Sequence, residues 1–158
     1  MRSRLRHWLP AIIVAAIISV FSTRYFSSDA TQEFFYPILH WLFPSASRHV
    51  IHLMHVGIRK LAHVAEFGVF SVTIFHGIRG DRHGWRFDWA FLTLLISVAF
   101  ACVDEFHQLF VPGREASPRD VAIDALGALL AQTLVWAYSK WRWGPREPQS
   151  IKSSSVVD

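Results

Sequence analysis

The sequence predicts an all-α integral membrane protein with four transmembrane helices and an interfacial outer segment between the first and the second. The composition supports this class, because 52% of the residues are hydrophobic and only 18% are charged, which is too apolar for a disordered chain. Four long stretches with few charges are each bounded by charged residues. Each is close to the length that a helix rising 1.5 Å per residue needs to cross about 30 Å of hydrocarbon. A soluble bundle is the alternative, but helices that are apolar all round leave too little polar surface for water.

The expected spans cover residues 7–24, 58–78, 87–109 and 118–140. The first stretch follows three arginines, which is also the pattern of a cleavable secretory signal. Residues 20–26 offer no pair of small residues for a signal peptidase, so we expect an uncleaved anchor. Residues 25–48 concentrate aromatic side chains and contain Pro37 and Pro44. Such a segment typically lies at the headgroup level, and a lid over a site is the alternative.

Lysine and arginine counts predict the orientation in the membrane. With the N-terminus inside, ten of the 16 basic residues lie on the cytoplasmic side: Arg2, Arg4, Arg6, Arg79, Arg82, Arg86, Lys140, Arg142, Arg146 and Lys152. This bias favours cytoplasmic positions for both termini. It also accounts for the net charge of +4, and no basic helix face or aromatic strand motif points to a nucleic acid. We therefore expect the lipid bilayer, and no nucleic acid, as a partner.

The chain is expected to form one transmembrane domain over residues 1–142. Residues 143–158 contain two prolines and a run of serines, which predicts a disordered cytoplasmic tail. The single cysteine, Cys102, excludes a disulfide within one chain and a cysteine-rich metal site.

Ionisable residues lie inside or at the edge of three of the expected spans. Lys60, His63 and Glu66 fall within about 120° of arc at 100° per residue, so they form one polar stripe at the start of the second span. His52 and His55 point roughly the same way if that helix begins earlier. The third span ends with four polar residues, Asp104, Glu105, His107 and Gln108. The alternative at this point is that the helix simply emerges into water.

The fourth span opens with Ser117, Pro118 and Asp120, the spacing of a capping box with proline at the first helical position. Asp124 lies one turn deeper, where a carboxylate costs roughly 2.5 to 3.5 kcal/mol at mid-membrane unless it faces protein or water. Asp120, Asp124, Gly127 and Ala131 share one helix face, and small residues allow another helix to approach closely. We expect this face to turn inward.

With the expected topology, all three polar segments lie at the outer face of the membrane. The candidate catalytic residues are Asp104, Glu105, His107, His63 and Glu66, and the candidate substrate-binding residues are Lys60, Gln108, Arg114, Asp120 and Asp124. Carboxylates and imidazoles can act as general acids and bases or hold a metal. No spacing matches a metal motif such as HExxH, so the metal and any cofactor stay unknown.

The same residues carry a resemblance to a known family. Lys60-x-x-His63-x-x-Glu66-Phe67, the run from Asp104 to Arg114 (DEFHQLFVPGR), and Ser117-x-x-Asp120-x-x-x-Asp124-x-x-Gly127 resemble the VanZ-like membrane proteins, named for a protein linked to teicoplanin resistance. Many relatives have asparagine at the position of Asp124. The resemblance implies a small multi-span protein of the bacterial cytoplasmic membrane, associated in some members with glycopeptide resistance.

Three functions are compatible with these residues. The first is a membrane enzyme acting on an envelope lipid at the outer leaflet. The second is a binding or shielding protein that holds an envelope lipid or glycopeptide headgroup, with basic side chains on its phosphate or carboxylate. The third is a structural or proton-coupled element, in which opposite charges hold the helices together.

Overall fold

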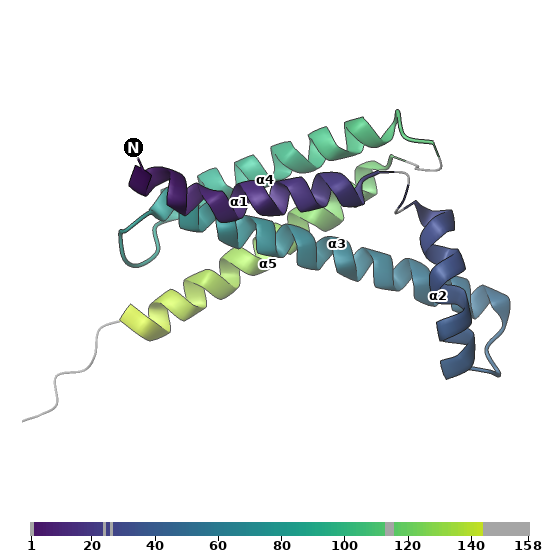
Figure 1. Cartoon of the computed structure of the whole chain (residues 1–158). Coiled ribbons are helices and arrows are strands. Elements are labelled where there is room, and N and C mark those ends of the chain that lie inside the picture. The colour runs from purple at the N-terminus through teal and green to yellow at the C-terminus, as the bar shows by residue number, and fades with distance from the viewer. Residues whose placement is uncertain (1, 24, 26, 113–115, 144–158) are drawn as a thin grey trace, which may run out of the picture.

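The computed structural model describes residues 2–23, 25, 27–112 and 116–143, and within these residues it consists of five α-helices and no strand. The helices are α1 (Arg2–Phe21), α2 (Ser28–Leu42), α3 (Arg48–Arg79), α4 (Phe87–Gln108) and α5 (Pro118–Trp143), as Figure 1 shows. The all-α prediction is therefore confirmed. The predicted tail, apart from Trp143 at the end of α5, lies outside the described residues.

Among the described residues, three helices are long and apolar enough to cross a membrane: α3, α4 and α5. The sequence predicted four. The first predicted span corresponds to α1, whose apolar segment Leu5–Phe21 has only 17 residues. At 1.5 Å per residue this segment is about 26 Å long, somewhat less than a hydrocarbon core of about 30 Å.

Helix α3 begins ten residues before the predicted start of the second span. Ser47 is its N-cap, and the Ser47 side chain accepts a hydrogen bond from the Val50 N–H at 3.4 Å. The helix ends at Gly80, which has a positive φ of 60° and donates its N–H to the His76 carbonyl. With 32 residues, α3 is about 48 Å long, so one end extends beyond a hydrocarbon core.

The extra length of α3 supports α2. Helix α2 occupies most of the segment expected at the interface, and it lies across the first part of α3 (Figure 1). Two polar contacts join the helices: His55 Nε2 lies 3.1 Å from Thr31 Oγ1, and His52 Nδ1 lies 3.1 Å from Gln32 Oε1. His52 and His55 therefore belong to the same helix as His63, as the sequence predicted for a longer helix.

Helix α3 is the centre of the bundle. It packs most extensively on α5 and also contacts α1 and α4. The main core joins α1, α3 and α4 through Ala11, Ile18, Phe67, Phe70, Ile74 and Ala101. Outward-facing positions on the same helices carry large apolar side chains such as Leu61 and Leu134, which are 70% and 71% exposed. Such an apolar exterior is what a lipid-facing surface requires.

The predicted inward face of α5 is confirmed. Asp124, Gly127 and Ala131 are buried where α5 crosses α3. At Gly127 the helices are in direct backbone contact, because a Cβ there would lie 2.9 Å from the Val64 Cα and 3.0 Å from the Val64 carbonyl carbon. Only a residue without a side chain fits this crossing.

Replacing Gly127 by alanine should therefore push α5 away from α3 and lower the free energy of unfolding by roughly 1–3 kcal/mol, as overpacking commonly does. Thermal unfolding in detergent micelles measures the change. Gly57→Ala is the matched control, because a Cβ at Gly57 meets nothing within 4 Å. An equal melting temperature for the two variants would contradict the close crossing.

Candidate functional site

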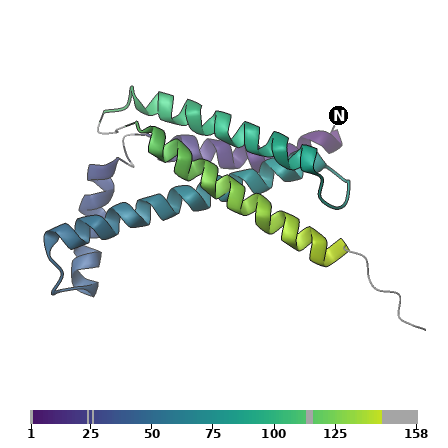
Figure 2. The same ribbon diagram turned by 180° about the vertical axis from the view of Figure 1, so that it is seen from behind.

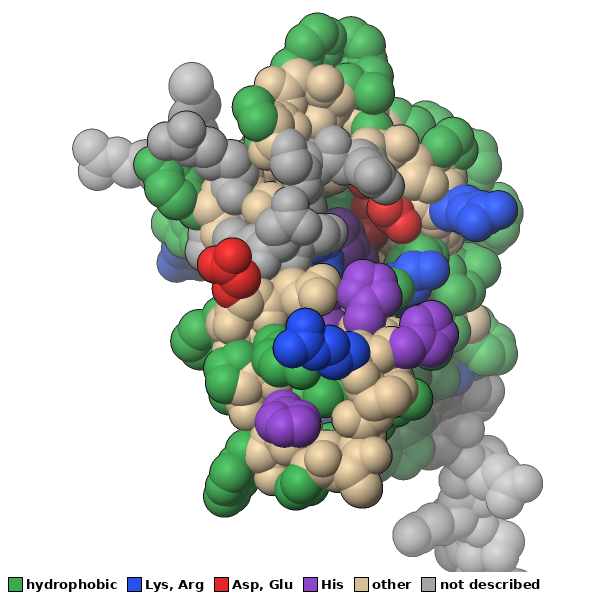
Figure 3. All heavy atoms as spheres, turned by 90° about the vertical axis from the view of Figure 1, so that its right-hand side faces the viewer, with side chains coloured by type: hydrophobic (Ala, Val, Ile, Leu, Met, Phe, Trp, Pro, Cys, Tyr) green, Lys and Arg blue, Asp and Glu red, His purple; other side chains and the backbone are tan. Residues whose placement is uncertain are grey.

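The polar ends of α3, α4 and α5 meet at the end of the bundle that carries α2. Histidine, basic and acidic side chains gather on this face and apolar side chains surround them, as Figure 3 shows. Two adjoining cavities open here, and both are lined by Arg59 and His63 of α3.

The larger of the two cavities, of about 400 Å³, is polar. Its lining comes from α2, α3, the end of α4 and the start of α5: Gln32, His52, His55, Val56, Arg59, Lys60, His63, Gln108, Ala116, Ser117 and Asp120. Basic and imidazole side chains outnumber the single carboxylate, Asp120. This cavity is thus suited to a negatively charged group.

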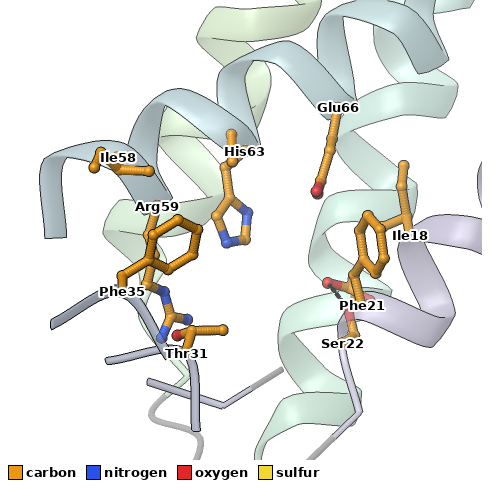
Figure 4. A pocket seen from close by; sticks show the side chains of 11 residues that line it. Ile18, Phe21, Ser22, Thr31, Phe35, Ile58, Arg59, His63 and Glu66 are labelled. Atoms are coloured by element: carbon orange, nitrogen blue, oxygen red, sulfur yellow. Dashed lines mark hydrogen bonds between the residues drawn. The ribbon is translucent and has the colours of Figure 1, made fainter. Parts of the chain in front are cut away.

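The smaller cavity, of about 260 Å³, is mainly apolar. It is lined by Ile18, Phe21, Ser22, Thr31, Phe35, Ile58, Arg59, Ala62, His63, Glu66 and Asp104. Figure 4 shows His63 and Glu66 pointing from α3 into the space between the end of α1 and the α2 residues Thr31 and Phe35. Helix α2 therefore forms a wall of both cavities, which corresponds to the lid considered as an alternative for residues 25–48.

His63 and Asp124 form a hydrogen-bonded pair between α3 and α5. His63 Nδ1 donates to Asp124 Oδ1 at 3.2 Å. Asp124 is fully buried, and its second oxygen, Oδ2, has no hydrogen-bond partner among the described residues. Because Nδ1 is used by Asp124, the other ring nitrogen of His63 is left for the cavities.

Asp104 belongs to a second, separate network that joins α1 to α4. Ser22 Oγ lies 2.6 and 2.7 Å from the two carboxylate oxygens of Asp104, and it donates its one proton between them. Gln108 Nε2 donates to Asp104 Oδ2 at 2.9 Å, which confirms the shared face predicted for these two residues. All three side chains are buried, so this network holds the end of α1 against the bundle.

Glu105 connects α4 to the beginning of α5. Its Oε2 accepts the backbone N–H of Ser117 at 2.8 Å, while Oε1 is buried without a hydrogen-bond partner among the described residues. Ser117 Oγ accepts the Arg119 N–H, so Ser117 caps α5 as predicted. A capping box also requires the Asp120 side chain to accept the Ser117 N–H, and this part of the prediction is wrong. The Ser117 N–H donates to Glu105 of α4, and Asp120 lines the polar cavity.

Most of the predicted site residues lie at this end of the bundle, and two need separate mention. His107 is exposed and lines neither cavity, because it is two residues from Glu105 and so points away from that carboxylate on the helix. Arg114 lies outside the described residues. The remaining eight line a cavity or join the networks: Lys60, His63, Glu66, Asp104, Glu105, Gln108, Asp120 and Asp124.

Sequence reasoning missed Arg59 and Ser22. Arg59 lies four residues after His55 and four before His63, so helical periodicity places it on the histidine stripe once α3 is known to begin at Arg48. Ser22 carries no such signal, because its partner Asp104 is 82 residues away.

In the part of the chain that the structure describes, no group of three or more His, Cys, Asp or Glu side chains is placed to hold a metal ion.

Comparison with known proteins identifies a family. Neither the curated proteins nor the solved structures gave a match to this chain. A sequence model of the VanZ/LLP1 family, in contrast, matches residues 6–139, which include α2, α3 and α4 completely and most of α1 and α5. The chain therefore belongs to the VanZ/LLP1 family.

Proposed function

We propose that this VanZ/LLP1 protein binds the anionic headgroup of an envelope lipid in the two adjoining cavities beside α2. The observation that carries the proposal is that Arg59 and His63 line both the polar and the apolar cavity. A lipid has the same division, since its phosphate or carboxylate is joined to a hydrocarbon chain. Both parts of one molecule can then occupy neighbouring cavities.

The charges support an anionic headgroup. Arg59 and Lys60 are cations in the polar cavity, and three histidines, His52, His55 and His63, add donors. An arginine guanidinium binds phosphate or carboxylate oxygens through two parallel hydrogen bonds. The apolar cavity contains two acids, Glu66 and Asp104, so we place the anionic group in the polar cavity, where Asp120 is the one acid among the lining residues. Apolar side chains such as Phe21, Phe35 and Ile58 provide contacts for the hydrocarbon.

Farnesyl phosphate, titrated into the purified protein by calorimetry in detergent, tests the proposal. Arg59→Gln should weaken binding about tenfold, the effect of losing a charge-assisted hydrogen bond. Arg48→Gln is the matched control, because Arg48 is exposed on the same helix and lines neither cavity. Farnesol, which lacks the phosphate, should bind weakly to all variants. Equal affinities for farnesyl phosphate and farnesol would contradict an anionic headgroup site.

The His63–Asp124 pair favours a second candidate function, acid-base catalysis on the same lipid. A histidine oriented by a carboxylate is a common general base, and the free nitrogen of His63 faces the cavities. His63→Gln should then reduce the rate of turnover of a phosphate-bearing lipid at least 100-fold. Farnesyl phosphate should still bind to this variant. Release of inorganic phosphate measures turnover, and its absence in the wild-type protein would leave binding as the function. Glu105 and Asp104 are less suited to this role, because both are bonded within the bundle.

We further propose that the protein crosses the bacterial cytoplasmic membrane four times, with α1 as the fourth crossing and both termini in the cytoplasm. Helix α1 packs along α3 through Ala11 and Ile18, and the basic residues are biased to the side of the termini. Fusions of the C-terminus to green fluorescent protein and to alkaline phosphatase test this topology. Fluorescence without phosphatase activity is expected, and the reverse result would contradict it.

The family resemblance also supports a link to glycopeptide resistance. Expression in a susceptible bacterium should raise the inhibitory concentration of teicoplanin, and Arg59→Gln should abolish the increase if the cavities carry the effect. An unchanged inhibitory concentration with normal protein level would exclude this role in that host.

A further inference from the structure

A third cavity, larger than the two beside α2, lies between α3 and α5, toward the end of the bundle opposite α2. It has a volume of about 970 Å³ and a mainly apolar lining, with Val69 and Val72 on α3 facing Leu130 and Leu134 on α5. The two helices cross at Gly127 and diverge toward their C-terminal ends (Figure 2). The cavity is therefore a groove between diverging helices, and it is separate from the site beside α2.

The groove ends at a basic side chain. Arg79, the last residue of α3, lines the groove and also lines a neighbouring cavity of about 670 Å³ that includes His7, Trp8 and Asp81. The Nε of Arg79 is buried and has no hydrogen-bond partner among the described residues. Because the Arg79 side chain lines both cavities, its guanidinium can reach an anionic group bound at the end of the groove.

The acid at this end faces outward. The Asp81 side chain is 80% exposed, and its Oδ1 lies 3.1 Å from His7 Nε2 without a hydrogen bond, while His7 Nδ1 lies 3.4 Å from His76 Nε2. Arg82 donates to the carbonyl oxygens of Ile78 and Arg79 and lies over the Trp89 ring. Among the described residues that line the groove, Arg79 is the one lysine or arginine.

We propose that the groove binds one acyl chain of an anionic phospholipid and that Arg79 binds its phosphate. The groove is long enough for one acyl chain. Fifteen residues separate Val64 from Arg79 along its α3 wall, which is about 22 Å at 1.5 Å per residue. The hydrocarbon of one leaflet is about 15 Å thick. A helix of a second protein copy would also fit an apolar groove, but an apolar helix face would offer no anion to the Arg79 guanidinium. The proposal does not depend on the function of the cavities beside α2.

Native mass spectrometry of the purified protein with phosphatidylglycerol or phosphatidylcholine, matched in acyl chains, tests the site. The Arg59→Gln background reduces the contribution of the other lipid site. In this background the protein should retain phosphatidylglycerol in preference to phosphatidylcholine. Adding Arg79→Gln should lower the affinity for phosphatidylglycerol about tenfold and abolish the preference. Arg142→Gln is the control, because it removes an equal charge from an exposed position outside both cavities.

A second pair of variants tests the groove itself. Val69→Trp should fill the groove and reduce the binding of both phospholipids, whereas Leu129→Trp, at an equally exposed position outside the groove, should not. If Arg79→Gln fails to fold, Arg79→Lys keeps the charge and should retain part of the preference. An unchanged phosphatidylglycerol preference in Arg79→Gln would overturn the proposal. So would glycerol phosphate that displaces the lipid with an affinity equal to that of phosphatidylglycerol. A dimer that disappears in Val69→Trp while lipid binding persists would show that the groove holds a second protein copy instead.

Discussion

Asp124→Leu should lower the free energy of unfolding by about 2–3 kcal/mol. The substitution keeps a side chain of similar size but removes the acceptor of His63, so a part-buried imidazole N–H loses its hydrogen bond inside the bundle. Asp124 is fully buried where α5 crosses α3. Thermal unfolding in detergent micelles measures the loss.

Two further variants show whether charge or hydrogen bonding matters at Asp124. Asp124→Asn retains an acceptor oxygen and should keep most of the stability. Asp88→Asn is the surface control, because Asp88 pairs with Arg86 in an exposed position and its loss should leave the melting temperature unchanged. A leucine variant as stable as the wild type would show that the His63–Asp124 pair contributes nothing to the fold.

Asp104→Leu should have an effect of similar size, about 3 kcal/mol, because it leaves both the Ser22 hydroxyl and the Gln108 amide buried without their acceptor. Ser22→Ala removes one donor and should lose less, about 1–2 kcal/mol. The end of α1 should separate from α4 in Asp104→Leu. A thiol-reactive probe at an introduced cysteine near the end of α1, such as Thr23→Cys after replacement of Cys102 by serine, should then react faster.

A second substitution distinguishes a structural from a ligand-binding role for Asp104. Asp104→Asn removes the charge but keeps an acceptor oxygen for the Ser22 hydroxyl, so if Asp104 acts only by holding α1, this variant should bind farnesyl phosphate with an affinity close to that of the wild type. Tenfold weaker binding by a well-folded variant would instead make Asp104 a ligand-binding residue. Ser22, Asp104 and Gln108 line the cavities and also bond to one another, so this test decides between the structural hypothesis and ligand binding for that network.

Sequence periodicity was sufficient to predict the helices of the bundle and the meeting of three polar segments. The inward face of α5 followed from Asp124, Gly127 and Ala131 at intervals of three and four residues, and the structure confirms it. The same reasoning applied to α4 would have turned His107 outward, because residues two apart lie about 200° from each other on a helix. His107 therefore shares the outer end of α4 with Glu105 but not its inward face.

Three features required the tertiary structure. The extension of α3 to Arg48 depends on Ser47 as a cap and on α2 packing across it, and no hydrophobic pattern marks that start. The bond between Glu105 and the Ser117 N–H replaces a local capping pair with a contact between helices. The Ser22–Asp104 bond joins residues that are distant in the chain. Each of these contacts depends on how helices dock, which periodicity within one helix does not contain.

The central claim is that an anionic lipid occupies the cavities that share Arg59 and His63. Photo-cross-linking with a farnesyl phosphate analogue that carries a diazirine in its chain, followed by peptide mapping, tests this claim most directly. Labels should appear on the apolar wall, at Phe21, Phe35 or Ile58, and excess unlabelled farnesyl phosphate should suppress them. Labels spread evenly over the exposed faces of α4 and α5, with no loss on competition, would contradict it.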